Sequence, residues 1–190
     1  MPSIIAGKRR GAKLLVPEGM GVRPTLARVR EALFSMLTSC LGSLEGLDVL
    51  DPFAGAGLLG LEAWSRGAAH VDFVEMNRAH FRILQRNIAT VGAAAQTTAL
   101  QGQSPRDWPR LGGRKYDLVL CDPPYADGLE TATLQTLLDC QLLKPHALVS
   151  IESDVQTAFA IPEGLELRRE RAYGKCMIRI VSPTVDPSRP

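Results

Sequence analysis

The sequence predicts an α/β fold in which helices cover both faces of an open, mostly parallel sheet. Between about residues 47 and 151, short apolar runs alternate with stretches whose apolar residues recur at helical spacing. Residues 165–172 and 176–181 form two further strands, and the segment between them is too short for a helix, so the two should pair antiparallel. A chain of 190 residues suits one domain with a full core and is short for two large domains.

The first predicted element is a basic N-terminal hairpin, in an extension that covers residues 1–22. Its two β-like runs, SIIAG and AKLLV, flank the turn KRRG, which presents lysine and arginine to solvent. A helix then opens at Pro24 and Thr25, and the Thr25 side chain can cap it. Arg28 and Arg30 lie off the apolar face of this helix, which is made by Leu26, Val29, Leu33, Met36 and Leu37.

The main domain, residues 23–182, continues with a series of strands and helices. Five strands are predicted over residues 47–51, 70–75, 97–100, 116–121 and 147–151. Between them lie helices over residues 58–66 and 129–140, and another that Asn77 caps and Gly92 stops. The tail, residues 183–190, holds three prolines and is predicted to be disordered.

Acidic residues stand at the ends of three apolar strands: Asp51, Glu75 and Asp122. In open α/β sheets, ligands bind at the carboxyl ends of the strands, near the point where the strand order reverses. A single acid in such a place is often a helix cap or a loop residue. Three of them, each closing an apolar strand, indicate a ligand site.

The first strand runs into a glycine loop, GAGLLG at residues 55–60, which matches the pattern G-x-G-x-x-G. Glycines allow a sharp turn and a close approach of a ligand to the backbone amides. A dinucleotide would bring a pyrophosphate to this loop, and the carboxylate of Asp51 would repel it. A carboxylate suits a cationic amino group instead, and Glu75 stands where an acid binds the ribose hydroxyls of an adenosyl group. The loop and its acids therefore favour S-adenosylmethionine over NAD.

The tetrapeptide Asp122-Pro123-Pro124-Tyr125 follows the buried strand 116–121. Two successive prolines lack N–H donors and fix the direction of the chain. The Asp122 carboxylate and the Pro123 carbonyl then offer two acceptors for the two hydrogens of an exocyclic amino group. Tyr125 can stack on the planar base that carries this group. The tetrapeptide therefore predicts Asp122, Pro123 and Tyr125 as the catalytic residues.

The motifs DPFAGAG, FVEMN and DPPY together resemble the amino-methyltransferases of the class I S-adenosylmethionine-dependent fold. The pieces IIAGKRRGAKLLVP and RPTLARVREALFSML further resemble the bacterial RsmD family, and the resemblance covers about residues 3–182. It implies methylation of the N2 amine of a guanine in 16S ribosomal RNA, within an assembled or partly assembled small subunit. It also implies a Rossmann-like, seven-stranded sheet with an antiparallel last strand, and a basic hairpin that grips RNA.

The resemblance assigns residues to each ligand. In the cofactor site it implies Asp51, Phe53, Ala54, Gly55, Gly57, Glu75, Met76, Gln103 and Ser104. Many members of the wider fold place an aspartate after the third strand, and here Gln103 replaces it, with an amide oxygen that can accept the same hydrogen bond. On the RNA side it implies Lys8, Arg9, Arg10, Lys13, Arg23, Thr25, Arg28 and Arg30.

Charge is uneven along the chain, whose formal net charge is +2. Residues 1–30 hold seven basic residues and one acidic residue, whereas the remainder carries a net charge of −4. A basic arm on a slightly acidic body indicates a polyanion partner. The sequence contains no run of about eighteen apolar residues, so no membrane span is predicted. The scattered cysteines and histidines predict neither a metal site nor a disulfide framework, so we expect a cytoplasmic protein. We also expect a monomer.

Three other functions remain open from the sequence. An NAD-linked oxidoreductase would need a catalytic Tyr–Lys pair, a cysteine or a histidine near the strand ends, and no convincing set is found. The intact DPPY tetrapeptide disfavours a non-catalytic RNA-binding assembly factor. The same tetrapeptide also fits adenine N6 in DNA or a protein glutamine as the methylated group, and the basic N-terminal pieces alone argue against these targets.

Overall fold

The structure is a computed structural model that describes residues 1–17, 24–124 and 129–184. Its helices and strands are, in chain order, α1 (Pro24–Leu41), β1 (Asp48–Asp51), α2 (Leu58–Ser65), β2 (His70–Glu75), α3 (Arg78–Val91), β3 (Thr97–Gln101), β4 (Tyr116–Cys121), α4 (Glu130–Asp139), β5 (Leu143–Asp154), β6 (Leu165–Tyr173) and β7 (Cys176–Pro183). Two short 3₁₀ helices are η1 (Ala94–Gln96) and η2 (Trp108–Leu111). The helices and strands predicted from residue 24 onwards are found in the predicted order.

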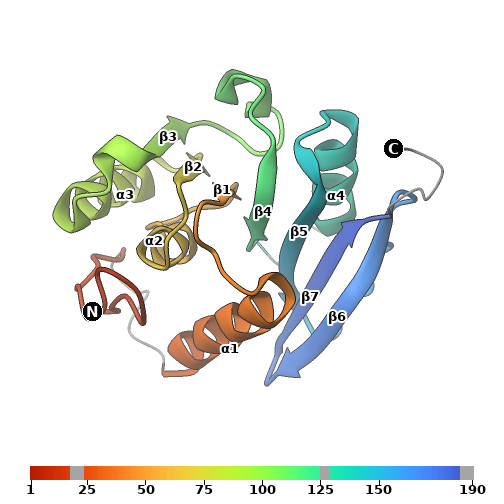
Figure 1. Ribbon diagram of the computed structural model, residues 1–190, viewed down its shortest axis with the longest axis horizontal. Helices are drawn as coiled ribbons and strands as arrows, with labels where there is room; N and C mark the ends of the chain where they lie inside the picture. The colour runs from red at the N-terminus through yellow and green to blue at the C-terminus, as the bar shows by residue number, and fades with distance from the viewer. Residues whose placement is uncertain (18–23, 125–128, 185–190) are drawn as a thin grey trace.

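All seven strands form one sheet in the order β3-β2-β1-β4-β5-β7-β6. Strand β7 pairs antiparallel with both of its neighbours, and the other neighbouring strands pair in parallel. Figure 1 shows β7 running between β5 and β6. The strand order reverses between β1 and β4, so the carboxyl ends of these two strands border the crevice where such sheets bind ligands. The predicted sheet, with its reversed last strand, is confirmed.

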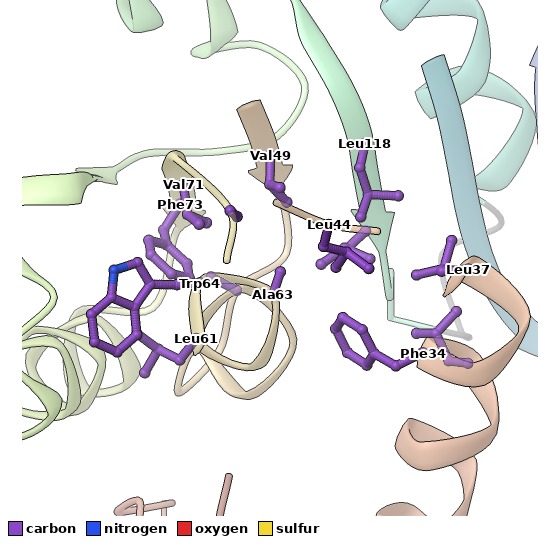
Figure 2. Close-up of a cluster of buried hydrophobic side chains, with 14 of the residues drawn as sticks. Phe34, Leu37, Leu44, Val49, Leu61, Ala63, Trp64, Val71, Phe73 and Leu118 are labelled. Atoms are coloured by element: carbon purple, nitrogen blue, oxygen red, sulfur yellow. The ribbon is translucent and has the colours of Figure 1, made fainter. Parts of the chain in front are cut away.

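Alternate strand residues point to opposite faces of the sheet and build two hydrophobic layers. One layer packs under α1, α2 and α3, and its strand residues include Val49, Val71, Phe73 and Leu118. Figure 2 shows side chains of α1 and α2 in one cluster with these strand residues, among them Phe34, Leu37, Leu61 and Trp64. The second layer includes Leu50, Val119, Val149, Leu134 and Leu137. Since Leu134 and Leu137 belong to α4, helices cover both faces of the sheet, as predicted.

The N-terminal segment, residues 1–17, lies beside α2 and α3 (Figure 1). One antiparallel bridge, between Ser3 and Lys13, joins its two arms across a turn, so the predicted hairpin has the expected turn but very short strands. Gly7 has a φ of +83°, and a Cβ atom at Gly7 would lie 1.8 Å from the carbonyl oxygen of Ser65. Glycine is therefore required where this segment meets α2.

Strand β5 is longer than predicted at both ends. At its start, the Lys144 ammonium lies 2.9 Å from the carboxylate of Asp48 and 2.7 Å from that of Asp117. These ion pairs attach Leu143 and Lys144 to the amino ends of β1 and β4, although Lys-Pro-His is not a strand-like sequence. At its other end, β5 continues past residue 151 to Asp154. This extension includes Glu152, a further acid at the carboxyl edge of the sheet.

Strand β7 also extends further than predicted, because it includes Pro183. The amide of Thr184 then donates a hydrogen bond to the carbonyl of Gly164 at 2.9 Å. The prediction of a disordered tail from residue 183 is therefore wrong for its first two residues, and residues 185–190 lie outside the described part of the chain. Among the described residues, no helix is both long and apolar enough to cross a membrane.

Candidate active site

The buried carboxylate of Asp51 fixes the loop after β1. It accepts a hydrogen bond from the amide of Gly60 at 2.9 Å. Burial, with the charges of Asp122 and Glu75, raises the pKa of Asp51 to about 7, although the bond from Gly60 opposes this shift. A Cβ atom on Gly60 would lie 2.3 Å from the ring of Phe73, so α2 can pack against β2 only with glycine there. Asp51 thus anchors α2 directly behind the glycine loop.

The carboxylate of Glu75, at the end of β2, joins the glycine loop to α3. One oxygen accepts a hydrogen bond from the amide of Gly55 at 2.7 Å, and the other from the amide of Asn77 at 2.6 Å. Apart from Gly55 and its two chain neighbours, no described residue has an atom within 4 Å of a Cβ position on Gly55, so the space beside the loop is open. Glu75 keeps further lone pairs for a ligand. Its neighbour Met76 is 67% exposed and offers an apolar surface there.

The segment after β3 is tied to the segment after β1. The hydroxyl of Ser104 donates a hydrogen bond to the carbonyl of Pro52, and the indole N–H of Trp108 donates to Ser104 Oγ at 3.0 Å. The amide of Gln103 donates to the carboxylate of Asp107 at 2.8 Å, and this bond lowers the pKa of Asp107. Gln103 and Ser104 are therefore held at the same edge of the sheet as Asp51 and Glu75.

Asp122 and Pro123 follow β4 at the switch point of the sheet. Pro123 is buried, whereas Asp122 is exposed at the mouth of the site. Neighbouring protein still withdraws the Asp122 carboxyl group partly from water, and this burial raises its pKa to about 6. Tyr125 lies outside the described residues, so its role in stacking remains a prediction.

Glu152, on β5, is a member of this edge that the sequence analysis missed. It is 8% exposed and lies one residue beyond the last paired residues of β4 and β5. Its carboxylate accepts a hydrogen bond from the Cys176 thiol at 3.3 Å. Burial and the charges of Asp122 and Asp51 raise the pKa of Glu152 to about 8. The signal that could have found it is an acid directly after the apolar run ALVSI, the same pattern that marks the other strand ends.

Four carboxyl groups therefore stand at the carboxyl ends of four strands: Asp51, Glu75, Asp122 and Glu152. The charges of Asp122 and Glu75 help to raise the pKa of Asp51, and those of Asp122 and Asp51 help to raise the pKa of Glu152. An edge of this kind disfavours a pyrophosphate and favours an organic cation with several hydrogen-bond donors. Within the part of the chain that the structure describes, no three His, Cys, Asp or Glu side chains gather as a metal site.

Most basic residues predicted to contact RNA are exposed: Lys8, Arg9, Arg10, Lys13 and Arg28. Two of them also hold the N-terminal segment in place. The Lys8 ammonium lies 4.0 Å from the ring centre of Trp64, and Arg9 Nε donates a hydrogen bond to the carbonyl of Val91 at 2.7 Å. Arg10 and Lys13 are therefore the residues of this segment best placed to contact an external anion.

Arg30 is buried, in contrast to the prediction that it lies on the exposed side of its helix. It is 6% exposed, its guanidinium donates a hydrogen bond to the carbonyl of Ser3 at 2.5 Å, and its Nε lies 4.0 Å from the carboxylate of Glu62. Burial lowers the pKa of Arg30. The structure thus assigns Arg30 to the docking of the N-terminal segment, not to RNA. Arg23 and the side chain of Thr25 lie outside the described residues.

The glycine loop, the acids at the strand ends and the reversed β7 define a class I methyltransferase. More particularly, the chain belongs to the RsmD family: the family model described as "Conserved hypothetical protein 95" matches residues 3–182. The predicted family and class are confirmed.

Individual relatives agree with this assignment. "Ribosomal RNA small subunit methyltransferase D" of Escherichia coli (strain K12) is 37% identical over 178 residues, which cover 93% of this chain and 87% of that protein. The protein of the same name from Haemophilus influenzae is 34% identical over 179 residues, 93% of this chain and 91% of that protein. A solved structure, "Putative methyltransferase yhhF from Escherichia coli", superposes with a TM-score of 0.84 at 34% identity and covers 97% of this chain and 98% of that chain.

Proposed function

We propose that the protein transfers a methyl group from S-adenosylmethionine to the exocyclic N2 amine of a guanine in 16S ribosomal RNA, in the cytoplasm. The observation that carries this proposal is the position of the Asp122-Pro123 exit from β4 beside the carboxyl groups of Asp51 and Glu152. The names of the relatives support ribosomal RNA of the small subunit as the substrate. The family resemblance supports the N2 amine of guanine as the methylated group.

The residues at the edge fit S-adenosylmethionine, which supplies a methyl group activated by the positive charge on sulfur. Glu75 has acceptor lone pairs left for ribose hydroxyls, and Met76 offers an exposed apolar surface for the adenine. The carboxylate of Asp51 balances the cationic amino group of the cofactor. The remaining proposed contacts line the same loops: Phe53, Ala54, Gly55, Gly57, Gln103 and Ser104.

The acceptor amine is the difficult partner in this reaction, because the N2 lone pair of guanine is delocalised into the ring. Hydrogen bonds from its two hydrogens to the Asp122 carboxylate and the Pro123 carbonyl turn the lone pair towards the methyl group, while Tyr125 stacks on the base. Such alignment can contribute up to about 7–11 kcal/mol to catalysis. When bound, S-adenosylmethionine would supply the methyl group from its sulfonium centre, and N2 would release one proton to solvent, which reaches the exposed Asp122.

Glu152 and Asp122 share this edge of the sheet, and both carboxyl groups have raised pKa values. The two carboxyl groups repel each other, and the pKa of Glu152 is raised to about 8 while that of Asp122 is raised to about 6. Because the upward shift is larger for Glu152, a proton on the pair favours Glu152 over Asp122. An ionised Asp122 accepts hydrogen bonds from an amine, and it also stabilises the positive charge that develops on N2 during transfer.

Tritium transfer from labelled S-adenosylmethionine tests the class of acceptor. The acceptors are small subunits that lack N2-methylated guanine, naked 16S ribosomal RNA, duplex DNA and ribosomal proteins. We expect the label in RNA, and none in DNA or protein. Label in DNA adenine or in a glutamine side chain would contradict the proposal. Calorimetric titration with NADH beside S-adenosylmethionine tests the cofactor, and only the latter should bind.

A further inference from the structure

A groove of about 460 Å³ lies between α1 and the edge strand β6. It lies apart from the residues that the glycine loop and the strand ends contribute. Figure 1 places α1 next to the end of β6, and places the N-terminal segment on the other side of α1. The polar residues that line the groove are Arg28, Glu31, Ser35, Ser39, Arg169, Arg171 and Tyr173.

The regular geometry of both elements directs these side chains into the groove. On β6, Arg169, Arg171 and Tyr173 alternate along the strand, so they share one face. Arg169 and Arg171 pair with Ile180 and Ile178 of β7, which belong to the hydrophobic layer under α1. On α1 the lining residues recur three or four positions apart, as one helical face requires. The hydroxyl of Tyr173 lies 3.8 Å from the Met36 sulfur and closes one end of the groove.

The groove is strongly basic. It collects three exposed arginines, Arg28, Arg169 and Arg171, against one acid, Glu31. Other charges on β6 and β7 are neutralised in ion pairs, Arg168 with Glu166 at 2.9 Å and Arg179 with Glu170 at 3.0 Å. Among the described residues, no such acid lies within 4.0 Å of the three groove arginines. Their charge is therefore available to an external anion.

The groove also leads towards the active site. Tyr173 pairs with Cys176 across the turn between β6 and β7. The Cys176 thiol donates a hydrogen bond to Glu152, so a few residues of chain separate the end of the groove from the acidic edge. A long polyanion bound in the groove would thus approach the site where Asp122 receives its amine.

We propose that this groove binds the phosphate backbone of the RNA substrate, through Arg28, Arg169 and Arg171. The inference rests on the proposed function, since it takes RNA as the substrate. Arginines on two rigid elements can each contact a phosphate, while Ser35 and Tyr173 can donate further hydrogen bonds to phosphate or sugar oxygens. The groove would hold RNA on the opposite side of α1 from the N-terminal segment, so that the two basic surfaces fix its direction across the site.

Binding of a 16S ribosomal RNA transcript, measured at several salt concentrations, tests this inference. Arg169→Gln with Arg171→Gln should weaken binding about five- to twentyfold near 0.1 M salt. The double variant should also lower the salt slope, the steepness with which the logarithm of affinity falls with the logarithm of salt concentration, by about one to two units, because fewer counterions are released. Glu31→Gln should strengthen binding about two- to threefold. The pair Arg169→Lys and Arg171→Lys should keep most of the slope. The exposed Lys115, at the amino end of β4, provides the control Lys115→Gln, which should change neither quantity.

The outcomes separate the groove from the proposed function. If the wild-type protein methylates ribosomal RNA but the glutamine variants keep its affinity and salt slope, the groove inference is wrong and the proposed function stands. If the variants bind naked RNA normally and lose binding to assembled small subunits alone, the groove contacts a ribosomal protein, and the inference is again wrong. If the wild-type protein neither binds nor methylates 16S ribosomal RNA, both fail. Calorimetry with S-adenosylmethionine should give equal affinities for all folded variants.

Discussion

The side chain of Asn87 donates a hydrogen bond to the carbonyl oxygen of Ala56, in the glycine loop, at 2.9 Å. Asn87 is fully buried in α3. Its side-chain oxygen also accepts a hydrogen bond from the amide of Leu15 at 2.8 Å, and its side-chain nitrogen donates one to the carbonyl of Leu15 at 2.9 Å. A single side chain therefore connects the basic N-terminal segment to the loop that we assign to the cofactor. This connection gives the N-terminal segment a route by which it can influence the cofactor site.

Asn87→Ala should lower the free energy of unfolding by about 2–3 kcal/mol, because it leaves buried backbone groups of Ala56 and Leu15 unpaired. It should also weaken S-adenosylmethionine binding, since the glycine loop loses its support. Urea unfolding and calorimetry measure the two effects. The exposed Gln85 of the same helix gives the control Gln85→Ala, which should change neither. If Asn87→Ala and Gln85→Ala have the same free energy of unfolding, the hydrogen bonds of Asn87 do not stabilise the fold.

Glu75→Ala should weaken S-adenosylmethionine binding by about 1.5–3 kcal/mol, the scale of hydrogen bonds to a charged group. The loss has two sources, the ribose contacts and the support of the Gly55 amide. Glu75→Gln keeps one acceptor oxygen and should lose less. Calorimetry on both variants, with Glu163→Ala as an exposed control, checks this. Unchanged affinity in Glu75→Ala would mean that the acid has a purely structural role.

Glu152→Gln should make stability less dependent on pH. The pKa of Glu152 is raised by burial, so the folded state binds this proton more tightly than the unfolded state. Its contribution to the free energy of unfolding is fully present below the ordinary glutamate pKa and is lost as the pH rises to about 8. The variant should therefore match the wild type near pH 4 and exceed it by about 1–3 kcal/mol above pH 8. A variant that is less stable at every pH would exclude a strained carboxylate at this position.

Arg10→Gln with Lys13→Gln should weaken RNA binding at all sequences and reduce the salt slope by about one to two units. These residues are chosen because Lys8 and Arg9 also hold the N-terminal segment on the domain. The charge-preserving pair Arg10→Lys and Lys13→Arg should retain the slope. Filter binding at three salt concentrations distinguishes the variants. An unchanged slope would mean that the segment merely covers α2 and α3.

The sequence predicts the fold well where local signals and burial agree. Asn77 caps α3 through hydrogen bonds from the amides of Ala79 and His80, and Gly92 ends it in a left-handed conformation, as their residue types indicate. Strand spacing likewise predicts the antiparallel pairing of β6 and β7, because their connection has no room for a helix. The same spacing places Asp51, Glu75 and Asp122 at one edge, since parallel strands end together.

Features that depend on packing between distant segments could not be predicted in this way. Arg30 lies off the apolar stripe of its helix, yet the N-terminal segment covers it and supplies the Ser3 carbonyl as its partner. Glu152 was missed because the strand was predicted to end at residue 151, although this acid directly follows the apolar run ALVSI. The groove beside β6 likewise exists only because α1 packs next to the edge strand.

The identity of the methylated atom tests the central claim most directly. Small subunits that lack N2-methylated guanine would be incubated with S-adenosylmethionine and either the wild-type protein or Asp122→Asn, and their RNA nucleosides analysed by mass spectrometry. We predict N2-methylguanosine with the wild type, and almost none with Asp122→Asn, whose S-adenosylmethionine affinity should stay within a few fold of normal. A methyl group on another atom, or near-normal turnover by Asp122→Asn, would contradict the account.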